Sequence, residues 1–97
     1  MPDLSLNVSL KVSGDVVFRE LDGEGVILNL ASGIYFGLDR TGTRMWQLID
    51  QHGQLAIVAA ALCEEYEVEP QLVERDLIQL ASELADKGLL VPAGDHS

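Results

Sequence analysis

The sequence has few of the residues from which metal centres, disulfides and catalytic sites are built. Cys63 is the only cysteine among 97 residues, so an internal disulfide bond is impossible. The two histidines, His52 and His96, belong to no metal-ligand spacing such as H-x-x-x-H or C-x-x-C. No combination of an acid, a base and a nucleophile is visible. We therefore expect no metal, no cofactor and no enzymatic activity, and we interpret Cys63 as a core thiol.

Basic residues are also scarce. Six Lys and Arg stand against 16 Asp and Glu, which gives a formal net charge of −10. Phosphate backbones and anionic membrane surfaces attract the opposite charge, so neither nucleic acid nor a membrane is an expected partner. No apolar run approaches the roughly 20 residues of a membrane span, and no signal peptide is visible. We expect a cytoplasmic protein with one folded domain.

The first half of the chain has the pattern of short β-strands. Residues 4–12 alternate apolar and polar side chains, which predicts a half-buried strand that pairs with the main sheet or with another copy in a homodimer. Residues 16–21, 26–30 and 34–38 are the next predicted strands. Glycine-containing turns separate them, which predicts an antiparallel three-stranded meander.

From Asp39 onward the apolar spacing becomes that of helices. Asp39 or Thr41 can cap a first helix that Gly53 ends, and Pro70 suits the first turn of a third. The predicted buried faces are Gly42, Met45, Trp46 and Ile49 in the first helix, Leu55, Val58, Ala59, Leu62 and Tyr66 in the second, and Val73, Leu77, Leu80, Ala81 and Leu84 in the third. Residues 89–91 are expected to form a short final strand.

These elements predict an α+β fold that resembles a winged helix-turn-helix, with a three-stranded antiparallel β-meander followed by three α-helices. We expect the domain to span residues 16–91. Residues 1–15 would be an N-terminal extension with a possible extra strand, and residues 92–97 a polar tail.

The predicted strand at residues 34–38 is the candidate functional element. A strand at the edge of its sheet has unused backbone N–H and C=O groups, which can accept an extended peptide as a further strand. Tyr35 and Phe36 must lie on opposite faces, so one faces the helices and the other is exposed. The exposed aromatic is either a binding contact or part of ordinary hairpin packing. Gly37 marks either a bulge or the close approach of another backbone.

The same stretch carries a family resemblance. The pattern Gly25-x-x-Leu28-Asn-Leu-x-x-Gly33-x-Tyr-Phe-Gly-Leu38-x-x-x-Gly42-x-x-x-Trp46 resembles the signature of the coenzyme PQQ synthesis protein D (PqqD) family. Three later patterns match as well: Tyr66-x-Val68, Val73-x-x-Asp76-Leu77 and Leu84-x-x-x-Gly88-Leu89-Leu90. The resemblance extends from about residue 16 to residue 91.

Such domains are also called RiPP recognition elements, after the ribosomally synthesised and modified peptides that they serve. The resemblance implies a winged-helix-like domain that binds the leader segment of a precursor peptide as a strand beside the third sheet strand and the third helix. One wall of the cleft would be Ile34, Tyr35, Phe36, Gly37 and Leu38, and the other Leu72, Val73, Asp76, Leu77 and Leu80. Asp76 matches a recurrent acidic position and would make a polar contact to the leader.

The predicted function is therefore that of a non-catalytic peptide-binding module. It would present a precursor peptide to a maturation enzyme such as a radical-SAM protein, a cyclase or a leader protease, in PQQ, lasso-peptide or related biosynthesis. The alternative is a winged-helix DNA-binding regulator whose third helix reads a groove. The charges of that helix argue against it, because Arg75 and Lys87 stand among Glu74, Asp76, Glu83 and Asp86.

Overall fold

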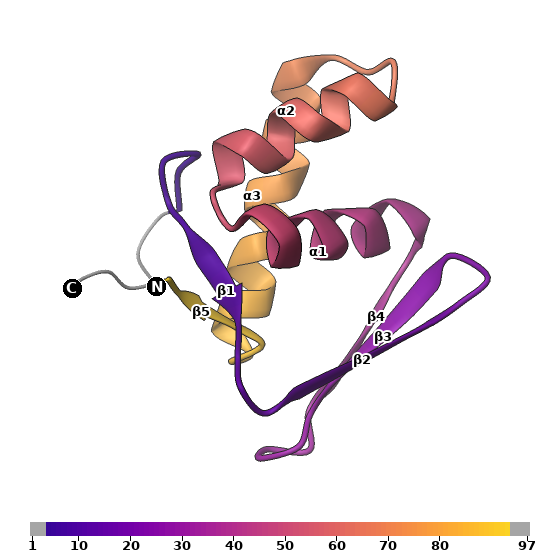
Figure 1. Cartoon of the computed structure of the whole chain (residues 1–97), viewed down its shortest axis with the longest axis vertical. Helices are drawn as coiled ribbons and strands as arrows, with labels where there is room; N and C mark the ends of the chain where they lie inside the picture. Colours follow the sequence, from indigo (N-terminus) through magenta and orange to yellow (C-terminus); the bar gives the residue numbers. More distant parts are fainter. Residues whose placement is uncertain (1–3, 94–97) are drawn as a thin grey trace.

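Two small antiparallel sheets and three helices make up the computed structural model, which describes residues 4–93 (Figure 1). In chain order the elements are β1 (Leu10–Val12), β2 (Val16–Leu21), β3 (Glu24–Asn29), β4 (Tyr35–Leu38), α1 (Arg40–His52), α2 (Leu55–Glu65), α3 (Pro70–Asp86) and β5 (Leu90–Pro92). The α+β class and the order of a three-stranded meander before three helices are confirmed.

The meander has the strand order β2-β3-β4, with both pairs antiparallel. Asp22 and Gly23 form the first turn with φ angles of 56° and 86°, the left-handed geometry that tight hairpins favour. The second turn is closed by Asn29, whose Oδ1 accepts hydrogen bonds from the N–H groups of Ala31 and Ser32 at 2.9 and 3.2 Å. This arrangement leaves β4 at the edge of the described sheet.

The helix boundaries follow from their capping residues. Asp39 caps α1, because its Oδ1 accepts a hydrogen bond from the Gly42 N–H at 2.8 Å. Gly53 ends α1 with a φ angle of 83°, which a glycine adopts without strain. Pro70 is the first residue of α3. The predicted buried face of α1 is confirmed at all four positions: Gly42, Met45, Trp46 and Ile49.

The inner face of the meander packs on α1. The rings of Phe18 and Trp46 lie 6.0 Å apart, and Ile27 beside them is fully buried. The Gly25 N–H donates to Thr43 Oγ1 at 2.8 Å. A Cβ atom on Gly25 would collide with the Phe18 ring, so this glycine is required by the packing of the sheet on the helix.

The prediction of one strand over residues 4–12 is wrong, because only Leu10–Val12 is a strand. The residues before β1 lie beside the start of α2. There the Leu55 and Ala56 N–H groups donate to the carbonyls of Val8 and Leu6, at 3.0 and 2.8 Å. The first N–H groups of a helix have no partner within it, and here the N-terminal segment supplies their acceptors. Its alternating pattern therefore reflects packing beside a helix.

β1 pairs with β5 within the chain, in the register of Leu10 with Pro92, rather than with the meander. On the other side of β1, the Leu10 N–H donates to Gly53 O at 3.0 Å. The described residues therefore give no support to a homodimer through this strand. Pro92, predicted to begin the polar tail, belongs to β5, and residues 94–97 of that predicted tail lie outside the described residues.

Two positions on the predicted helix faces also differ. Tyr66 lies just beyond α2 and is exposed, and Leu80 of α3 is only half-buried. Both side chains border the depressions described below. Among the residues described, no helix is both long enough and apolar enough to cross a membrane.

Candidate peptide-binding site

β4 presents an open backbone edge. Asn29 N–H donates to Ile34 O at 2.8 Å, so a hydrogen-bonded pair stands directly before the ladder of β3 and β4. Hydrogen-bonded pairs alternate along an antiparallel ladder, so Phe36 and Leu38 bond to β3. The backbone N–H and C=O groups of Tyr35 and Gly37 then point away from β3, toward a side on which none of residues 4–93 pairs with β4. Four outward-pointing groups at this spacing are what an added strand needs.

The side chains of β4 alternate as predicted. Tyr35 is 73% exposed on the outer face, whereas Phe36 is half-buried against the core and Leu38 is buried. Lys87, just after α3, places its Nζ 5.9 Å from the centroid of the Phe36 ring. One end of β4 therefore lies near the C-terminal end of α3.

A groove of about 380 Å³ runs between the first turns of α1 and the middle of α3. It begins where β4 ends. Its lining residues are Asp39, Thr41, Gly42, Met45, Asp76, Gln79, Leu80 and Glu83. Three of them, Asp39, Asp76 and Glu83, are acidic, so the groove favours a neutral or basic guest over an acidic one.

A smaller apolar pocket of about 130 Å³ continues from the groove toward the start of α3. Thr41, Met45 and Asp76 line both, so the two depressions are contiguous. The rest of the pocket is formed by Leu62, Tyr66, Val68, Leu72 and Val73. Tyr66, Val68 and Leu72 are among the large apolar side chains that remain exposed, at 39%, 47% and 49%. An apolar side chain of a bound peptide would cover them.

Of the five residues predicted for the α3 wall, four lie at the groove or the pocket. Leu72, Val73, Asp76 and Leu80 line the pocket or the groove. Leu77 does not, because it is fully buried in the core and offers no surface to a ligand. Ile34 is exposed but belongs to the turn before β4. Asp76 lies 3.5 Å from Arg75 Nε, and both side chains are exposed, so its carboxylate is accessible to a guest.

Comparison with known proteins identifies the family. The family described as Coenzyme PQQ synthesis protein D (PqqD) matches residues 24–90, which include the meander from β3 onward and all three helices. The chain belongs to the PqqD family. No curated protein sequence matches it significantly.

Two solved structures resemble this PqqD-family domain over nearly their whole length. One is described as TbiB1 in complex with the TbiA(beta) leader peptide. It is 39% identical, with a TM-score of 0.77, and the match covers 90% of this chain and 99% of that chain. The other is described as lasso peptide synthetase B1 complexed with the leader peptide. It is 30% identical, with a TM-score of 0.76, and the match covers 87% and 99% of the two chains.

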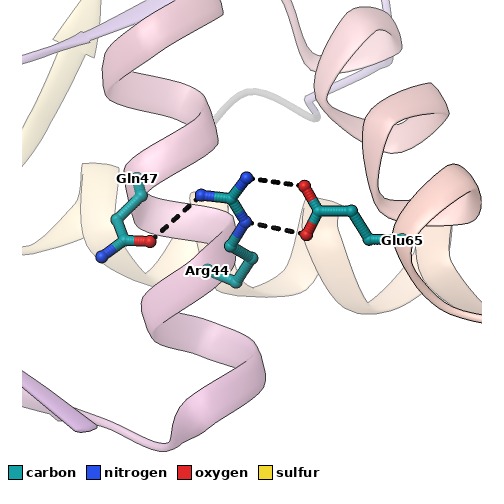
Figure 2. A network of polar contacts seen from close by, with 3 residues as sticks. All are labelled: Arg44, Gln47 and Glu65. Carbon is teal, nitrogen blue, oxygen red and sulfur yellow. Dashed lines mark hydrogen bonds and ion pairs between the residues drawn. The ribbon is translucent and has the colours of Figure 1, made fainter. Parts of the chain in front are cut away.

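In this PqqD-family domain a polar network fixes the end of α2 beside the pocket (Figure 2). Arg44 of α1 donates from Nε and Nη2 to the two carboxylate oxygens of Glu65, at 2.8 and 2.6 Å. Gln47 joins the network by accepting from Arg44 Nη1 and donating to Glu20 of β2, at 3.2 and 2.8 Å. Because Tyr66 directly follows Glu65, the network holds one wall of the pocket against α1.

The Arg44–Glu65 ion pair shifts the pKa of both side chains. The hydrogen bond from Arg44 lowers the pKa of Glu65 below its usual value, and the hydrogen bond to Glu65 raises the pKa of Arg44. Both side chains are 35% exposed, so the pair is screened by water. Within residues 4–93, no cluster of three His, Cys, Asp or Glu side chains has the arrangement of a metal site.

The sequence did not predict the groove residues of α1 or the pocket wall beyond α2. The sequence predicts a capping role for Thr41 and a core position for Met45, yet both line the pocket. Helical spacing predicts a buried Tyr66, and Val68 stands out in the sequence only through its match to the family pattern. The sequence feature that could have revealed them is the position of Tyr66 and Val68 in the connection between two helices. Apolar side chains there do not belong to the packed face of a helix.

Proposed function

We propose that this PqqD-family protein binds the leader segment of a ribosomally synthesised precursor peptide by strand addition to β4. The observation that carries the proposal is the open edge at Tyr35 and Gly37, next to a groove and an apolar pocket. The likeness to two proteins whose structures contain leader peptides supports it. Backbone hydrogen bonds would supply affinity, and the side-chain pockets would supply selectivity.

The contact residues follow from this placement. The backbone of Tyr35 and Gly37 would pair with the leader, while Leu72 and Val73 would contact an apolar leader side chain in the pocket. Asp76 lies at the junction of groove and pocket, where its carboxylate would accept a hydrogen bond from the leader. Leu80 would contact the leader along the groove, and Leu77 would support the site from the core.

The role that we propose is that of an accessory protein without a catalytic step of its own. A bound leader tethers the rest of the precursor, which raises its effective concentration at a maturation enzyme that engages the complex. The likeness to a lasso peptide synthetase component favours a lasso-type pathway, in which the enzyme would be a leader protease or a cyclase. A radical-SAM enzyme of PQQ biosynthesis is the alternative that the family allows.

Two variants of one residue test strand addition. The probes are the candidate leader peptides from small open reading frames that neighbour the gene for this chain, each titrated by calorimetry. Tyr35→Pro removes the outward N–H without removing a ladder hydrogen bond, which an edge strand tolerates. Tyr35→Ala removes the same side chain and keeps the N–H. We expect proline to weaken binding by at least about tenfold relative to alanine, with little change in melting temperature. Equal binding by the two variants would contradict strand addition.

A further inference from the structure

Gly37 stands where the protein itself does not require a glycine. Glycine weakens a strand interior and normally marks a bulge, an unusual φ angle or a close contact. Gly37 lies in the regular register of β4, opposite Val26. It has no positive φ angle, and a Cβ atom built on it would meet nothing within 4 Å. A larger residue would fit the isolated domain and strengthen its strand.

The missing side chain leaves a hollow on the outer face of the sheet. The register places Arg19, Val26 and Gly37 in one cross-strand row, on the face turned away from α1. Val26 is 48% exposed there, because Gly37 does not cover it. A depression of about 520 Å³ occupies this position. Its lining residues are Leu21, Glu24, Gly25, Val26, Gly37, Leu38 and Asp39.

A strand added at β4 would extend this row by one residue. Residues directly opposite each other in neighbouring strands place their side chains on the same face. The leader residue paired with Gly37 would therefore project onto the outer face, where its side chain can lean over Gly37 and contact Val26. Packing of a large side chain over a cross-strand glycine stabilises strand pairing. Tyr35, two residues away on the same face and 73% exposed, would flank it.

We propose that Gly37 determines specificity by leaving room on the outer face for one large apolar side chain of the leader. The subsite is separate from the pocket between the helices and lies on the opposite face of the sheet. The inference rests on the proposed function, since it needs a strand added at β4. Leu21 and Val26 supply the apolar surface, and the carboxylates of Glu24 and Asp39 also line the hollow, so an acidic side chain is disfavoured.

The test combines variants of Gly37 with an alanine scan of the leader. The probe is the leader peptide that binds in the titrations described above, with each large apolar residue replaced by alanine in turn. Gly37→Val should weaken binding of the unmodified leader by roughly tenfold, and Gly37→Ala by less. One leader position should be coupled to Gly37. The leader with alanine at that position should bind the wild-type protein roughly tenfold more weakly than the unmodified leader does. The same alanine leader should bind Gly37→Val almost as well as it binds the wild-type protein.

Gly14 provides the matched control. It lies in the turn before β2, has no positive φ angle, and a Cβ atom there also meets nothing within 4 Å. Gly14→Val should leave binding unchanged. Both Gly37 variants should melt no lower than the wild type, and Gly37→Ala provides the comparison if valine alters the fold.

The outcomes separate this inference from the proposed function. Undiminished binding by Gly37→Val would overturn the inference alone. The inference would also be overturned if Gly37→Val weakened the binding of every alanine variant of the leader by the same factor. Gly37 would then only allow the leader backbone to approach, without selecting a side chain. No binding of the leader to the wild-type protein would contradict the proposed function itself, and the inference with it.

Discussion

Asn29 joins the β3–β4 turn to the end of α3, since its Nδ2 donates to Gly88 O at 3.3 Å. The same side chain closes the turn through Oδ1 and is 7% exposed. β4 and α3 are the two elements between which a guest strand would lie. One buried amide therefore connects both walls of the proposed site.

Replacing Asn29 tests this connection. Asn29→Asp keeps the oxygen that closes the turn but replaces the Nδ2 donor with an oxygen facing Gly88 O. We expect the free energy of unfolding to fall by about 1–3 kcal/mol, the cost of an unsatisfied buried group. Urea denaturation measures the change. Asn7→Asp makes the same chemical change at an exposed residue and should be neutral; equal effects of both variants would rule out the role assigned to Asn29.

The close packing of the sheet on α1 gives a second prediction. Gly25→Ala places a methyl group against the Phe18 ring. Overpacking of this kind costs about 1–3 kcal/mol, which thermal melting would detect. The control is Gly14→Ala, where the added methyl group meets nothing. A Gly25→Ala protein as stable as this control would mean that the sheet can shift away from α1.

The apolar pocket predicts a separation of binding from stability. Leu72 is 49% exposed at the pocket, and Ile57 of α2 is 46% exposed but lines neither the pocket nor the groove. Leu72→Ala should raise the dissociation constant of the leader roughly tenfold, the effect of about 1.4 kcal/mol of lost apolar contact. Ile57→Ala should not. Both should change stability by less than about 0.5 kcal/mol. Similar affinities for the two variants would remove Leu72 from the site.

The Arg44–Glu65 pair predicts a specific pH dependence. The pKa of Glu65 is lowered in the folded state. Its contribution to the free energy of unfolding is therefore complete above the pKa of the unfolded state, about 4.3, and is lost as the pH falls through the lower pKa of the folded state. The difference in unfolding free energy between wild type and Glu65→Gln should be below about 1 kcal/mol at pH 7. It should shrink toward zero as the pH falls through the lowered pKa of Glu65. Glu67→Gln, outside the network, should show no such trend; a constant difference for Glu65→Gln would contradict the assignment.

Local chemistry predicted much of the fold. Asp39, Gly53 and Pro70 mark helix ends by capping and backbone geometry, which depend on adjacent residues only. The order of the meander followed from its two turns, and the resulting edge strand from that order. Residues 4–9 were mispredicted because an alternating pattern does not reveal whether the backbone pairs with a strand or with the start of a helix.

The site was less predictable because it depends on how the helices pack. Leu77 and Leu80 share one apolar pattern in α3, yet one is in the core and the other borders the groove. Helical spacing defines the apolar face of a helix, but it does not show how far the neighbouring elements cover that face. The pocket wall at Tyr66 directly follows Glu65, whose ion pair with Arg44 joins residues 21 positions apart in the sequence, which no local pattern specifies.

Amide hydrogen exchange, followed by NMR with and without the leader peptide, tests strand addition at β4 most directly. The register turns the N–H groups of Tyr35 and Gly37 away from β3, whereas those of Phe36 and Leu38 face β3. We expect Tyr35 and Gly37 to become strongly protected when the leader binds, with much smaller changes at Phe36 and Leu38. Saturating leader binding that leaves the exchange of Tyr35 and Gly37 unchanged would contradict strand addition.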